Sequence, residues 1–328
     1  MQTPPTDTHW LEAAARLAAR GRPLSRPNPA VGCIIVKDGA VAGRGWTAEG
    51  GRPHAEAAAL AQAGGRSRGA TAYVTLEPCA HRSERGPACA DLLAGSGLAR
   101  VVIGAGDPDP RTAGGGIARL RDAGIDAVLL PSRASQDSLA GYLLRAAEGR
   151  PFVTLKLALS LDGCIAAANG ESQWITGEEA RAHVHSRRAM QDAILVGGGT
   201  WRADSPRLDV RLPGLEARNP RRVVLTRGVP PEGTTIINEP AHIARLSGVQ
   251  YLYVEGGAGA AASFLAADLV DRLEVYRAPI VIGGGRPGVG DIGLGSLAEA
   301  HGRWEEVEHR RLGSDRFTAY RRIRKQEA

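Results

Sequence analysis

The chain has few aromatic residues, few cysteines and no long apolar run. Aromatic side chains make up 4% of its 328 residues, so any hydrophobic core must consist mainly of Ala, Val, Leu and Ile. Four cysteines do not make a disulfide-bonded scaffold at this length. No apolar run approaches the roughly 18 residues that a membrane-spanning helix needs. The first ten residues, MQTPPTDTHW, lack the apolar segment of an export signal, so we expect a cytoplasmic protein.

The sequence also lacks an arginine-rich arm, a stripe of basic and aromatic residues, and internal repeats. Its net charge is +6, from 41 basic and 35 acidic residues. That excess suits an anionic partner such as a phosphorylated small molecule, a dinucleotide or RNA, but a general preference for arginine explains it equally well. Because the basic residues are spread along the chain, we expect a small-molecule substrate and neither a nucleic acid nor a membrane as partner.

A chain of this length is expected to hold two domains. The segment Glu148-Gly-Arg-Pro151 interrupts the pattern of strands and helices and predicts domains over 1–148 and 149–328. Both halves alternate strand-like and helix-like segments, which predicts α/β domains with helices on both faces of a sheet. In the first half we expect helices over 8–20, 55–63, 88–94, 116–123 and 135–147, and strands over 31–36, 41–46, 71–76, 101–103 and 127–130. In the second half we expect helices over 178–188 and 259–267, and strands over 152–159, 193–196, 222–225, 251–254, 272–276 and within 304–322.

His54, Cys79 and Cys89 form the most informative pattern in the chain. One imidazole and two thiolates can hold zinc and leave a fourth position for water. Glu56 lies two residues after the histidine, where a hydrolytic site needs a proton carrier. His-x-Glu followed by Pro-Cys is typical of zinc-dependent nucleobase deaminases. Each half of the site is predicted at a strand-to-helix transition, where free backbone amides favour a bound anion.

A surface histidine with two core thiols is the alternative interpretation of these residues. The combination of His-x-Glu at one helix start with Pro-Cys after a strand and Cys at the next helix start favours catalytic zinc. Nine residues separate Cys79 from Cys89, where the common deaminase pattern has two. This spacing also excludes a closed structural zinc site of the Cys-x-x-Cys type.

Three stretches of the second half could bind a ligand. The segment 155–163, Leu-Lys-Leu-Ala-Leu-Ser-Leu-Asp-Gly, places a lysine on a predicted strand, where an edge strand with a solvated lysine is the simpler interpretation. The segments 196–200 and 254–262 each follow a strand with several glycines, as backbone that binds phosphate does. Two such strand ends in one domain suit a nucleotide, although a glycine-rich turn without a ligand explains either one equally well.

Taken in order, these motifs resemble the bifunctional deaminase–reductase family of bacterial riboflavin biosynthesis. The matching segments run from the first helix to the C-terminus. They are Asn28-Pro-x-Val-Gly32, His54-Ala-Glu56, Thr75-Leu-Glu-Pro-Cys79-x-His81, Gly86-Pro-x-Cys89, Asp107-Pro-x-Pro110, Leu155-Lys-Leu, Ser160-Leu-Asp-Gly163, Gly170-Glu-Ser-Gln-Trp-Ile-Thr176, Asp204-Ser-Pro and Val254-Glu-Gly-Gly257. The wide spacing between the cysteines is itself a trait of this family.

The resemblance implies a cytidine-deaminase-like three-layer α/β/α domain followed by a dihydrofolate-reductase-like α/β domain. The first would hydrolyse the 2-amino group of 2,5-diamino-6-(5-phosphoribosylamino)pyrimidin-4-one, and the second would reduce the ribosyl chain to ribityl with NADPH. The family's zinc ligands match His54, Cys79 and Cys89, and its proton carrier matches Glu56. The implied substrate-binding residues are Asn28, His81, Lys156, Ser172, Arg188, Leu208, Arg211 and Glu255. The implied NADPH-binding residues are Ala158, Trp174, Thr200, Asp204, Gly257, Ala258, Gly259, Ala260, Ala261, Ala262 and Ser263. A homo-oligomer is also expected from the resemblance.

Two segments depart from the family pattern. The loop 82–86 is one residue longer than the common form and lacks its usual Gly-Arg-Thr-Pro-Pro run. The stretch between Leu225 and Tyr251 is shorter than in the family, which normally has another strand and a helix there, and here we expect only a brief helical segment. Two alternatives follow: a deaminase with a degenerate C-terminal domain that supports oligomerisation, and an RNA-editing deaminase suggested by the basic charge.

Overall fold

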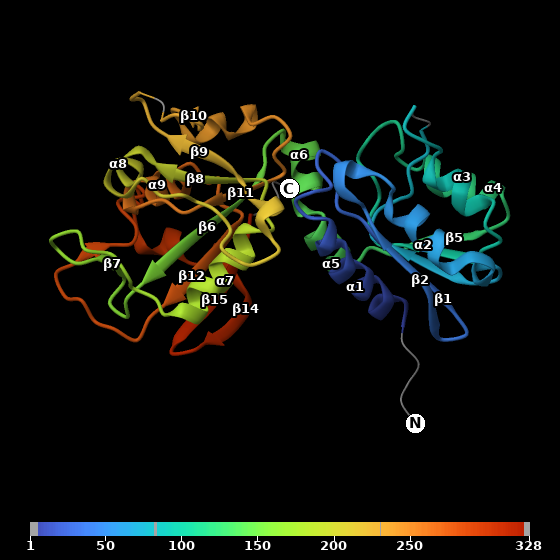
Figure 1. The fold of residues 1–328 in the computed structure, drawn as a ribbon, viewed down its shortest axis with the longest axis horizontal. Coiled ribbons are helices and arrows are strands. Elements are labelled where there is room, and N and C mark those ends of the chain that lie inside the picture. The colour runs from blue at the N-terminus through green and yellow to red at the C-terminus, as the bar shows by residue number, and fades with distance from the viewer. Residues whose placement is uncertain (1–5, 82–83, 230, 325–328) are drawn as a thin grey trace. The chain divides into compact units, whose positions relative to one another are not determined.

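The computed structural model describes residues 6–81, 84–229 and 231–324, which divide into two compact units, Met1–Gly149 and Arg150–Ala328 (Figure 1). Gly149 follows the last helix of the first unit with a φ of 71°, a left-handed conformation that favours glycine and ends the helix. The N-terminal stretch used to predict the absence of an export signal begins in residues 1–5, outside the described residues. Within the described part, no helix is long and apolar enough to cross a membrane.

The described residues of the first unit form a five-stranded sheet in the order β2-β1-β3-β4-β5. Its first three strands are antiparallel neighbours, whereas β3, β4 and β5 run parallel. The strands are β1 (Gly32–Lys37), β2 (Ala40–Trp46), β3 (Thr71–Val74), β4 (Arg100–Ile103) and β5 (Asp126–Leu129). The α-helices are α1 (Asp7–Ala18), α2 (Ala55–Ala63), α3 (Cys89–Ala94), α4 (Gly115–Asp122), α5 (Arg133–Ser138) and α6 (Ala140–Glu148). Short 3₁₀ helices cover η1 (Ala19–Gly21), η2 (Glu49–Gly51) and η3 (Gly64–Ser67).

Helices cover both faces of this sheet, as the alternating pattern predicts. On one face α1 packs against β1 and β3, where Leu11, Ile34 and Tyr73 share an apolar cluster. On the other face lies the larger core, in which Ile35 and Leu93 are fully buried. These three layers hold the predicted site between strand ends and helix starts.

Glycines on β2 bring α2 close to the sheet. A Cβ at Gly45 would lie 2.3 Å from the carbonyl oxygen of Ala55, and one at Gly43 would lie 2.2 Å from that of Ala59. Because any side chain at these positions would collide with the helix backbone, the pair of glycines determines how near α2 can lie. This contact positions the first turn of α2, which carries Glu56 and is preceded directly by His54.

The described residues of the second unit form an eight-stranded sheet in the order β10-β9-β8-β11-β6-β12-β15-β14. The six strands from β10 to β12 in that order are parallel, and β15 and β14 are antiparallel. Its strands are β6 (Phe152–Leu159), β8 (Ala193–Gly197), β9 (Arg221–Leu225), β10 (Thr235–Ile237), β11 (Tyr251–Val254), β12 (Arg272–Arg277), β14 (Trp304–Leu312) and β15 (Asp315–Arg322). A separate pair joins β7 (Cys164–Ala166) to β13 (Arg286–Pro287). The helices are α7 (Glu178–Arg188), α8 (Gly198–Asp204) and α9 (Ala258–Ala266), with 3₁₀ helices η4 (Glu216–Arg218), η5 (Pro240–Arg245) and η6 (Leu297–Ala300).

The two faces of this second sheet have different partners. Phe264 of α9 joins the large apolar core with Leu155 and Leu252. On the opposite face, Val184 of α7 packs beside Tyr276. The face of the sheet under α7 also buries charged side chains, among them Glu274.

The sequence pattern was wrong in several places within the described residues. The helix predicted over 135–147 is two helices, because Leu139 leaves the helical conformation at φ −102° and ψ 4°. The glycine-rich stretch after β8 forms α8, and β7, β10 and β13 were not predicted because two or three residues are too few to show a periodicity. In the shortened stretch before Tyr251, β10 adds a strand where only a brief helical segment was expected.

Candidate active sites

His54, Cys79 and Cys89 come together at the ends of three elements of the first unit. His54 is the residue that precedes α2, Cys79 follows β3, and Cys89 is the first residue of α3. The Nδ1 atom of His54 lies 3.2 Å from Sγ of Cys89 and 3.6 Å from Sγ of Cys79. The candidate ligand atoms of all three residues lie within 4.8 Å of one another, as the sequence pattern predicts.

This arrangement fits a zinc ion. With zinc about 2.1 Å from nitrogen and about 2.3 Å from sulfur, a tetrahedral site separates N and S by roughly 3.6 Å. The observed separations are close to that value. The backbone N–H of Cys89 also donates to Sγ of Cys79 at 3.3 Å. A hydrogen bond from the Cys89 side chain holds the pKa of Cys79 below its ordinary value, so Cys79 is the group of the pair that ionises first.

Glu56 lies beside these three residues on the first turn of α2. Its side chain is almost completely buried, with 3% of the residue exposed. Burial raises its pKa above the ordinary carboxyl value, against the lowering effect of His54. A carboxyl group with a raised pKa next to a metal-bound position is suited to accept and return a proton.

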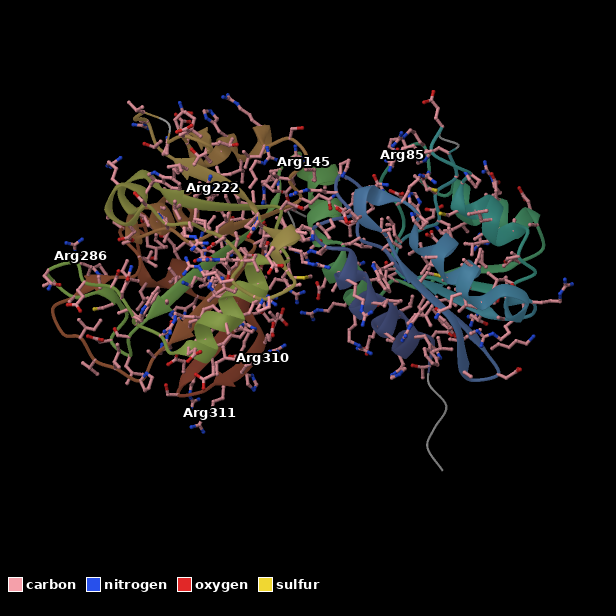
Figure 2. All side chains as sticks on the ribbon, viewed as in Figure 1. Arg85, Arg145, Arg222, Arg286, Arg310 and Arg311 are labelled. Atoms are coloured by element: carbon pink, nitrogen blue, oxygen red, sulfur yellow. The ribbon has the colours of Figure 1, made fainter. Side chains whose placement is uncertain are left out.

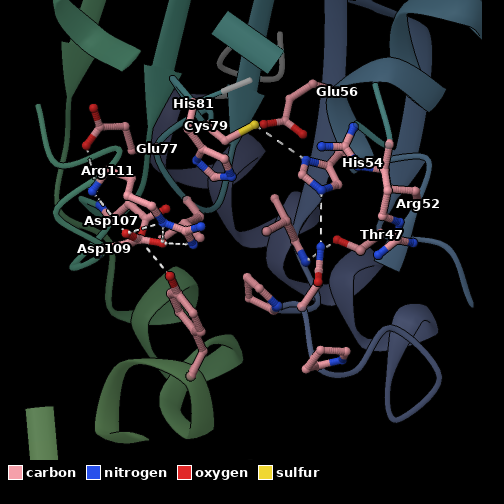
Figure 3. Close-up of a pocket in the computed structure, with 17 residues that line it drawn as sticks. Thr47, Arg52, His54, Glu56, Glu77, Cys79, His81, Asp107, Asp109 and Arg111 are labelled. Carbon is pink, nitrogen blue, oxygen red and sulfur yellow. Dashed lines mark hydrogen bonds and ion pairs between the residues drawn. The ribbon is translucent and has the colours of Figure 1, made fainter. Parts of the chain in front are cut away.

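The two other predicted residues of this site, Asn28 and His81, line the same cavity. The Nδ2 atom of Asn28 lies 3.2 Å from Nε2 of His54 and donates to the carbonyl oxygen of Gly51 at 3.3 Å. Nδ1 of His81 lies 3.3 Å from the hydroxyl of Thr112. The cavity has a volume of about 380 Å³. In Figure 3, His54, Glu56 and Cys79 lie at one side and Asp107, Asp109 and Arg111 at the other, with His81 between them.

The far wall of this cavity was not assigned from the sequence. The hydroxyl of Tyr142, from α6, donates to Oδ1 of Asp107 at 2.7 Å. Burial raises the pKa of Asp107. Asp109 accepts from Nε of Arg111 at 3.0 Å, and that partner lowers the pKa of Asp109 to about 2. The motif at 107–110 signalled two of these residues, but Tyr142 lies 35 positions from Asp107 and no local pattern pointed to it.

Two arginines also line this cavity without having been predicted. Arg52 precedes the candidate ligand His54 by two residues, and Arg85 donates to the carbonyl oxygen of Gly50 at 2.6 Å. Arg85 belongs to the lengthened loop at 82–86, of which residues 82 and 83 lie outside the described residues. The cavity therefore combines cations near the metal ligands with carboxylates at the opposite wall.

In the second unit, Glu255 binds two of the predicted basic residues. Nε and Nη2 of Arg188 donate to the two oxygens of Glu255 at 2.6 and 2.8 Å, and Nζ of Lys156 lies 3.8 Å from Oε2. Burial alone would raise the pKa of Glu255, but Arg188 and Lys156 hold it at about 2. Burial lowers the pKa of Lys156 against the opposing effect of Glu255.

Arg211 is connected to this group through Asp209. Nε of Arg211 donates to Oδ1 of Asp209 at 2.9 Å, while Nη1 of Arg188 donates to the backbone oxygen of Asp209 at 3.0 Å. Leu208 is buried among Ile194 and other apolar side chains, so only its backbone is available to a ligand. Ser172 lies in the loop after β7, and no described contact joins it to Arg188 or Glu255.

Thr200, Asp204 and the predicted cofactor residues 257–263 follow the carboxyl ends of β8 and β11, which are neighbours in the sheet, whereas Ala158 and Trp174 lie elsewhere in the unit. The backbone N–H of Gly257 donates to the hydroxyl of Thr200 at 3.2 Å, which joins the two strand ends. A Cβ at Gly256 would lie 2.4 Å from that of Ala260, so this loop requires glycine. The conformation leaves backbone amides at the start of α9 for a phosphate.

The remaining cofactor candidates fall into two groups. Ala260, Ala261 and Ala262 are buried, so their side chains support α9 and cannot reach a ligand. The hydroxyl of Ser263 donates to the backbone oxygen of Ala260 at 2.9 Å. The more accessible members are Ala158 on β6, Trp174 in the loop before α7, Asp204 at the end of α8, and Ala258 and Gly259 at the start of α9.

Besides Glu255, the second unit buries a carboxylate that was not predicted from the sequence, Glu274. It is fully buried on β12 and accepts from Nε of Arg187 at 2.9 Å, Nε of Arg272 at 3.0 Å and the hydroxyl of Tyr253 at 2.8 Å. Its neighbour in the pairing of β6 and β12 is Lys156. The alternation of polar and apolar residues along 272–276 predicts a strand, but it does not show which basic side chains pair with Glu274.

Both units match known protein families. Residues 4–105 match the family model described as the cytidine and deoxycytidylate deaminase zinc-binding region, and residues 151–317 match the RibD C-terminal domain. The riboflavin biosynthesis protein RibD of Escherichia coli is 39% identical over 92% of this chain and 96% of its own. That of Corynebacterium ammoniagenes is 43% identical over 80% of this chain and 83% of its own.

Solved structures agree with these sequence relatives. Acinetobacter baumannii RibD, form 1, superposes with a TM-score of 0.85 at 34% identity, covering 97% of this chain and 99% of that one. A Thermotoga maritima protein described as a diaminohydroxyphosphoribosylaminopyrimidine deaminase/5-amino-6-(5-phosphoribosylamino)uracil reductase superposes with a TM-score of 0.84 at 30% identity, over 97% and 100%. Both halves are covered, which favours two activities over a deaminase with a degenerate second half or an RNA-editing enzyme. The chain belongs to the RibD family, the zinc-dependent deaminases and NADPH-dependent reductases of riboflavin biosynthesis.

Proposed function

We propose that the first unit removes the 2-amino group of 2,5-diamino-6-(5-phosphoribosylamino)pyrimidin-4-one and that the second unit reduces the ribosyl chain of the product to ribityl. One observation carries the proposal for the first step. His54, Cys79 and Cys89 gather within 4.8 Å beside the buried Glu56, at a cavity of about 380 Å³. That volume suits a small heterocycle with a sugar attached.

In the deamination step, Glu56 is the proton carrier. His54, Cys79 and Cys89 would hold a zinc ion, which would lower the pKa of a water molecule and so supply a nucleophile near neutral pH. Glu56 accepts the proton that the water gives up during attack on the amidine-like carbon. It then donates a proton to the amino nitrogen, which leaves as ammonia. The raised pKa of Glu56 supports both transfers, because a group that binds its proton weakly could not return it.

Asn28 and His81 are proposed to bind the pyrimidine ring in this cavity. Both side chains line the cavity: Asn28 lies against His54, and His81 lies between the proposed metal ligands and the carboxylates of the far wall (Figure 3). Asn28 is held in place by its bond to Gly51. Asp107, which Tyr142 orients, adds an acceptor for a ring or exocyclic N–H. These contacts would place the carbon that carries the amino group next to Glu56.

For the reduction step, the proposed substrate site lies around Glu255. Nε, Nη1 and Nη2 of Arg188 already donate to Glu255 or to the backbone of Asp209, so Arg188 is suited to orient Glu255. Arg211 uses only Nε on Asp209 and its side chain is 48% exposed, which leaves donors for the substrate phosphate. Lys156 lies close enough to Glu255 to contact the ribosyl chain bound beside it. Ser172 and the backbone of Leu208 would complete the site.

NADPH supplies the hydride for this second step. We propose that its phosphates bind the amides at the start of α9, where Gly257, Ala258 and Gly259 lie, and the first turn of α8, which carries Thr200. Ala158 would contact the nicotinamide end, since it lies on β6 two residues after Lys156, and the family resemblance places Trp174 there as well. The packing of α9 would support this phosphate site through Ala260, Ala261, Ala262 and Ser263. Asp204, at the end of α8, would border the same site.

We further propose a cytoplasmic homo-oligomer without a nucleic acid or membrane partner. The four cysteines are all free and buried, which suits a reducing compartment. Among the labelled arginines of the second unit, Arg222 and Arg286 lie apart from each other and from the neighbouring pair Arg310 and Arg311 on β14 (Figure 2), and a nucleic-acid site would gather more of them. The homo-oligomer is proposed from the family resemblance alone, and light scattering of the purified chain tests it.

The decisive experiment is a two-step assay combined with metal analysis. The purified chain should contain one zinc ion, release ammonia from the pathway substrate, and then oxidise NADPH with the deaminated product. Ammonia release without NADPH oxidation would contradict the reductase assignment. Neither activity in a zinc-loaded chain would contradict the whole proposal.

A further inference from the structure

One buried carboxylate of the first unit, Glu77, takes no part in the proposed chemistry. Only 3% of the residue is exposed, and it precedes Cys79 by two positions. In Figure 3 its side chain lies on the same side of the cavity as the far wall, which Asp107, Asp109 and Arg111 form. Glu77 therefore lies close in the chain to a proposed zinc ligand and close in space to the opposite wall.

The carboxylate of Glu77 accepts hydrogen bonds from backbone N–H groups at both ends of the segment 107–117. This segment carries the far wall and continues into the first turn of α4. The four donors are Asp107 at 3.4 Å and Gly114 at 3.1 Å to Oε2, and Gly116 at 3.0 Å and Ile117 at 3.2 Å to Oε1. One buried side chain thus holds the beginning and the end of the wall.

Close packing at Gly116 strengthens the same connection. A Cβ at Gly116 would lie 2.1 Å from the carbonyl oxygen of Pro78 and 3.2 Å from Oε1 of Glu77. Any side chain there would push the start of α4 away from the chain that leads to Cys79. The hydrogen bonds of Glu77 and the close approach of Gly116 therefore depend on one geometry, which we call the Glu77–Gly116 joint.

The proposed zinc ligand beside this joint has supports of its own. The carbonyl oxygen of Cys79 accepts from the N–H of Ala90 at 3.2 Å, and its Sγ accepts from the N–H of Cys89 at 3.3 Å. In contrast, His81 depends on the wall, because its Nδ1 lies 3.3 Å from the hydroxyl of Thr112 within the segment 107–117. Loss of the joint should therefore disturb the substrate contacts more than the zinc ligands.

We propose that Glu77 is a positioning residue of the deamination site, which fixes the far wall at a set distance from Cys79 before the substrate binds. This inference rests on the deamination function proposed above. A fixed wall costs little ordering entropy when the pyrimidine binds, whereas a loose wall must be ordered at that moment. Glu56 lies on α2, outside the joint. Glu77 therefore acts on substrate affinity and leaves zinc binding and proton transfer in place.

Steady-state kinetics of ammonia release by the zinc-loaded full chain test this role. Glu77→Gln keeps the shape of the side chain but replaces one acceptor oxygen by a donating amino group. We expect KM for the pyrimidine substrate to rise about tenfold to a hundredfold, while kcat changes less than about threefold. Zinc content should stay at the wild-type value. The matched control is Asp91→Asn, because Asp91 accepts from Arg119 of α4 at 2.9 Å, outside the wall, and it should leave KM unchanged.

A second variant tests the joint from its other side. Gly116→Ala leaves the carboxylate in place but separates the start of α4 from Pro78. KM should rise in the same range as in Glu77→Gln. Because either change breaks the same joint, KM of the double variant should rise by much less than the product of the two single effects.

Hydrogen exchange measures the joint without turnover. In a Glu56→Gln chain, in which turnover should be blocked, saturating substrate should slow exchange of the amides at 114–117 by less than about twofold, because they are already bonded. Without substrate, Glu77→Gln should speed exchange there by at least about tenfold, while peptides of β5 keep their wild-type rates. The first measurement leaves the joint intact, so it holds even where a variant of the joint does not fold.

Four results would overturn the inference. They are an unchanged KM in both variants, a lower kcat at unchanged KM as partial unfolding would give, loss of zinc from Glu77→Gln, and strong protection of 114–117 only when substrate binds. A zinc-loaded wild-type chain that releases no ammonia would instead contradict the deamination function itself. A wild-type chain that releases ammonia while both variants keep its KM would contradict only the role of Glu77.

Discussion

Arg188 of α7 and Glu255 at the end of β11 form a two-bond ion pair, with nitrogen–oxygen distances of 2.6 and 2.8 Å. The pair joins a helix that covers the sheet to the strand end at which we place the substrate. Only 8% of the Glu255 side chain is exposed, so Arg188 compensates a carboxylate that has little access to water.

Replacement of Arg188 by lysine tests this pairing. Arg188→Lys keeps the charge but cannot donate two parallel bonds to one carboxylate. We expect kcat/KM for reduction to fall about tenfold to a hundredfold, the effect of losing a charged hydrogen bond. Deamination by the same chain should be unchanged and is the internal control. A variant that reduces the substrate at the wild-type rate would show that the second bond is not needed.

Glu56→Gln should abolish deamination without loss of zinc. Glutamine occupies the same space but cannot carry a proton, so the deamination rate should fall by at least about a hundredfold. Zinc content by atomic emission should remain at the wild-type value, and reduction of the deaminated product should continue. Deamination at near the wild-type rate would contradict the role of Glu56 as proton carrier.

Removal of zinc should affect only the first activity and should expose two thiols. A chelator is expected to stop ammonia release while NADPH oxidation with the deaminated product continues. Cys79 and Cys89 line the cavities of this site and should then react with a thiol reagent, whereas Cys33 in the apolar core and Cys164 on β7 are not candidate ligands and should keep their reactivity. An increase of two reactive thiols per chain in parallel with lost zinc would support the site. Loss of zinc with no change in thiol reactivity would contradict it.

The stability of the reductase unit should depend on pH through Glu255. Its folded pKa of about 2 lies below the ordinary value of 4.5, so the ionised group stabilises the fold at pH above that ordinary value. This contribution should be lost as the pH falls from 4.5 toward 2. Thermal unfolding at several pH values measures the effect, and Glu255→Gln should flatten the dependence in this window. Glu305→Gln, at a half-exposed ion pair with Arg321, should leave the dependence unchanged.

Glu274→Ala should strongly destabilise the second unit. The substitution leaves Arg187 and Arg272 without the carboxylate that they share under α7. The loss of one partner from a buried ion pair costs about 3–5 kcal/mol of unfolding free energy. Urea unfolding of the full chain measures it, with Glu306→Ala at an exposed pair with His309 as the control. A loss below about 1 kcal/mol would mean that the two arginines find other partners.

Local signals in the sequence were sufficient for the metal site and for much of the secondary structure. His54 begins a helix, Cys79 follows a strand and Cys89 begins the next helix, so each ligand is marked by the residues beside it. The elements over 55–63, 152–159, 178–188 and 251–254 have the predicted bounds for the same reason. The resemblance to the family then assigned roles that spacing alone left open.

Tertiary structure decided which distant residues meet. Arg188 and Glu255 are 67 positions apart, and Tyr142 and Asp107 are 35 apart. A periodic pattern shows which face of a helix or strand is buried, but it does not show which other element covers that face. β11 lies between β8 and β6, which brings Glu255 next to Lys156 and the two glycine loops next to each other. The charges of the proposed reductase site therefore depend on the order of strands in the sheet, whereas each proposed zinc ligand is marked by its neighbours in the chain.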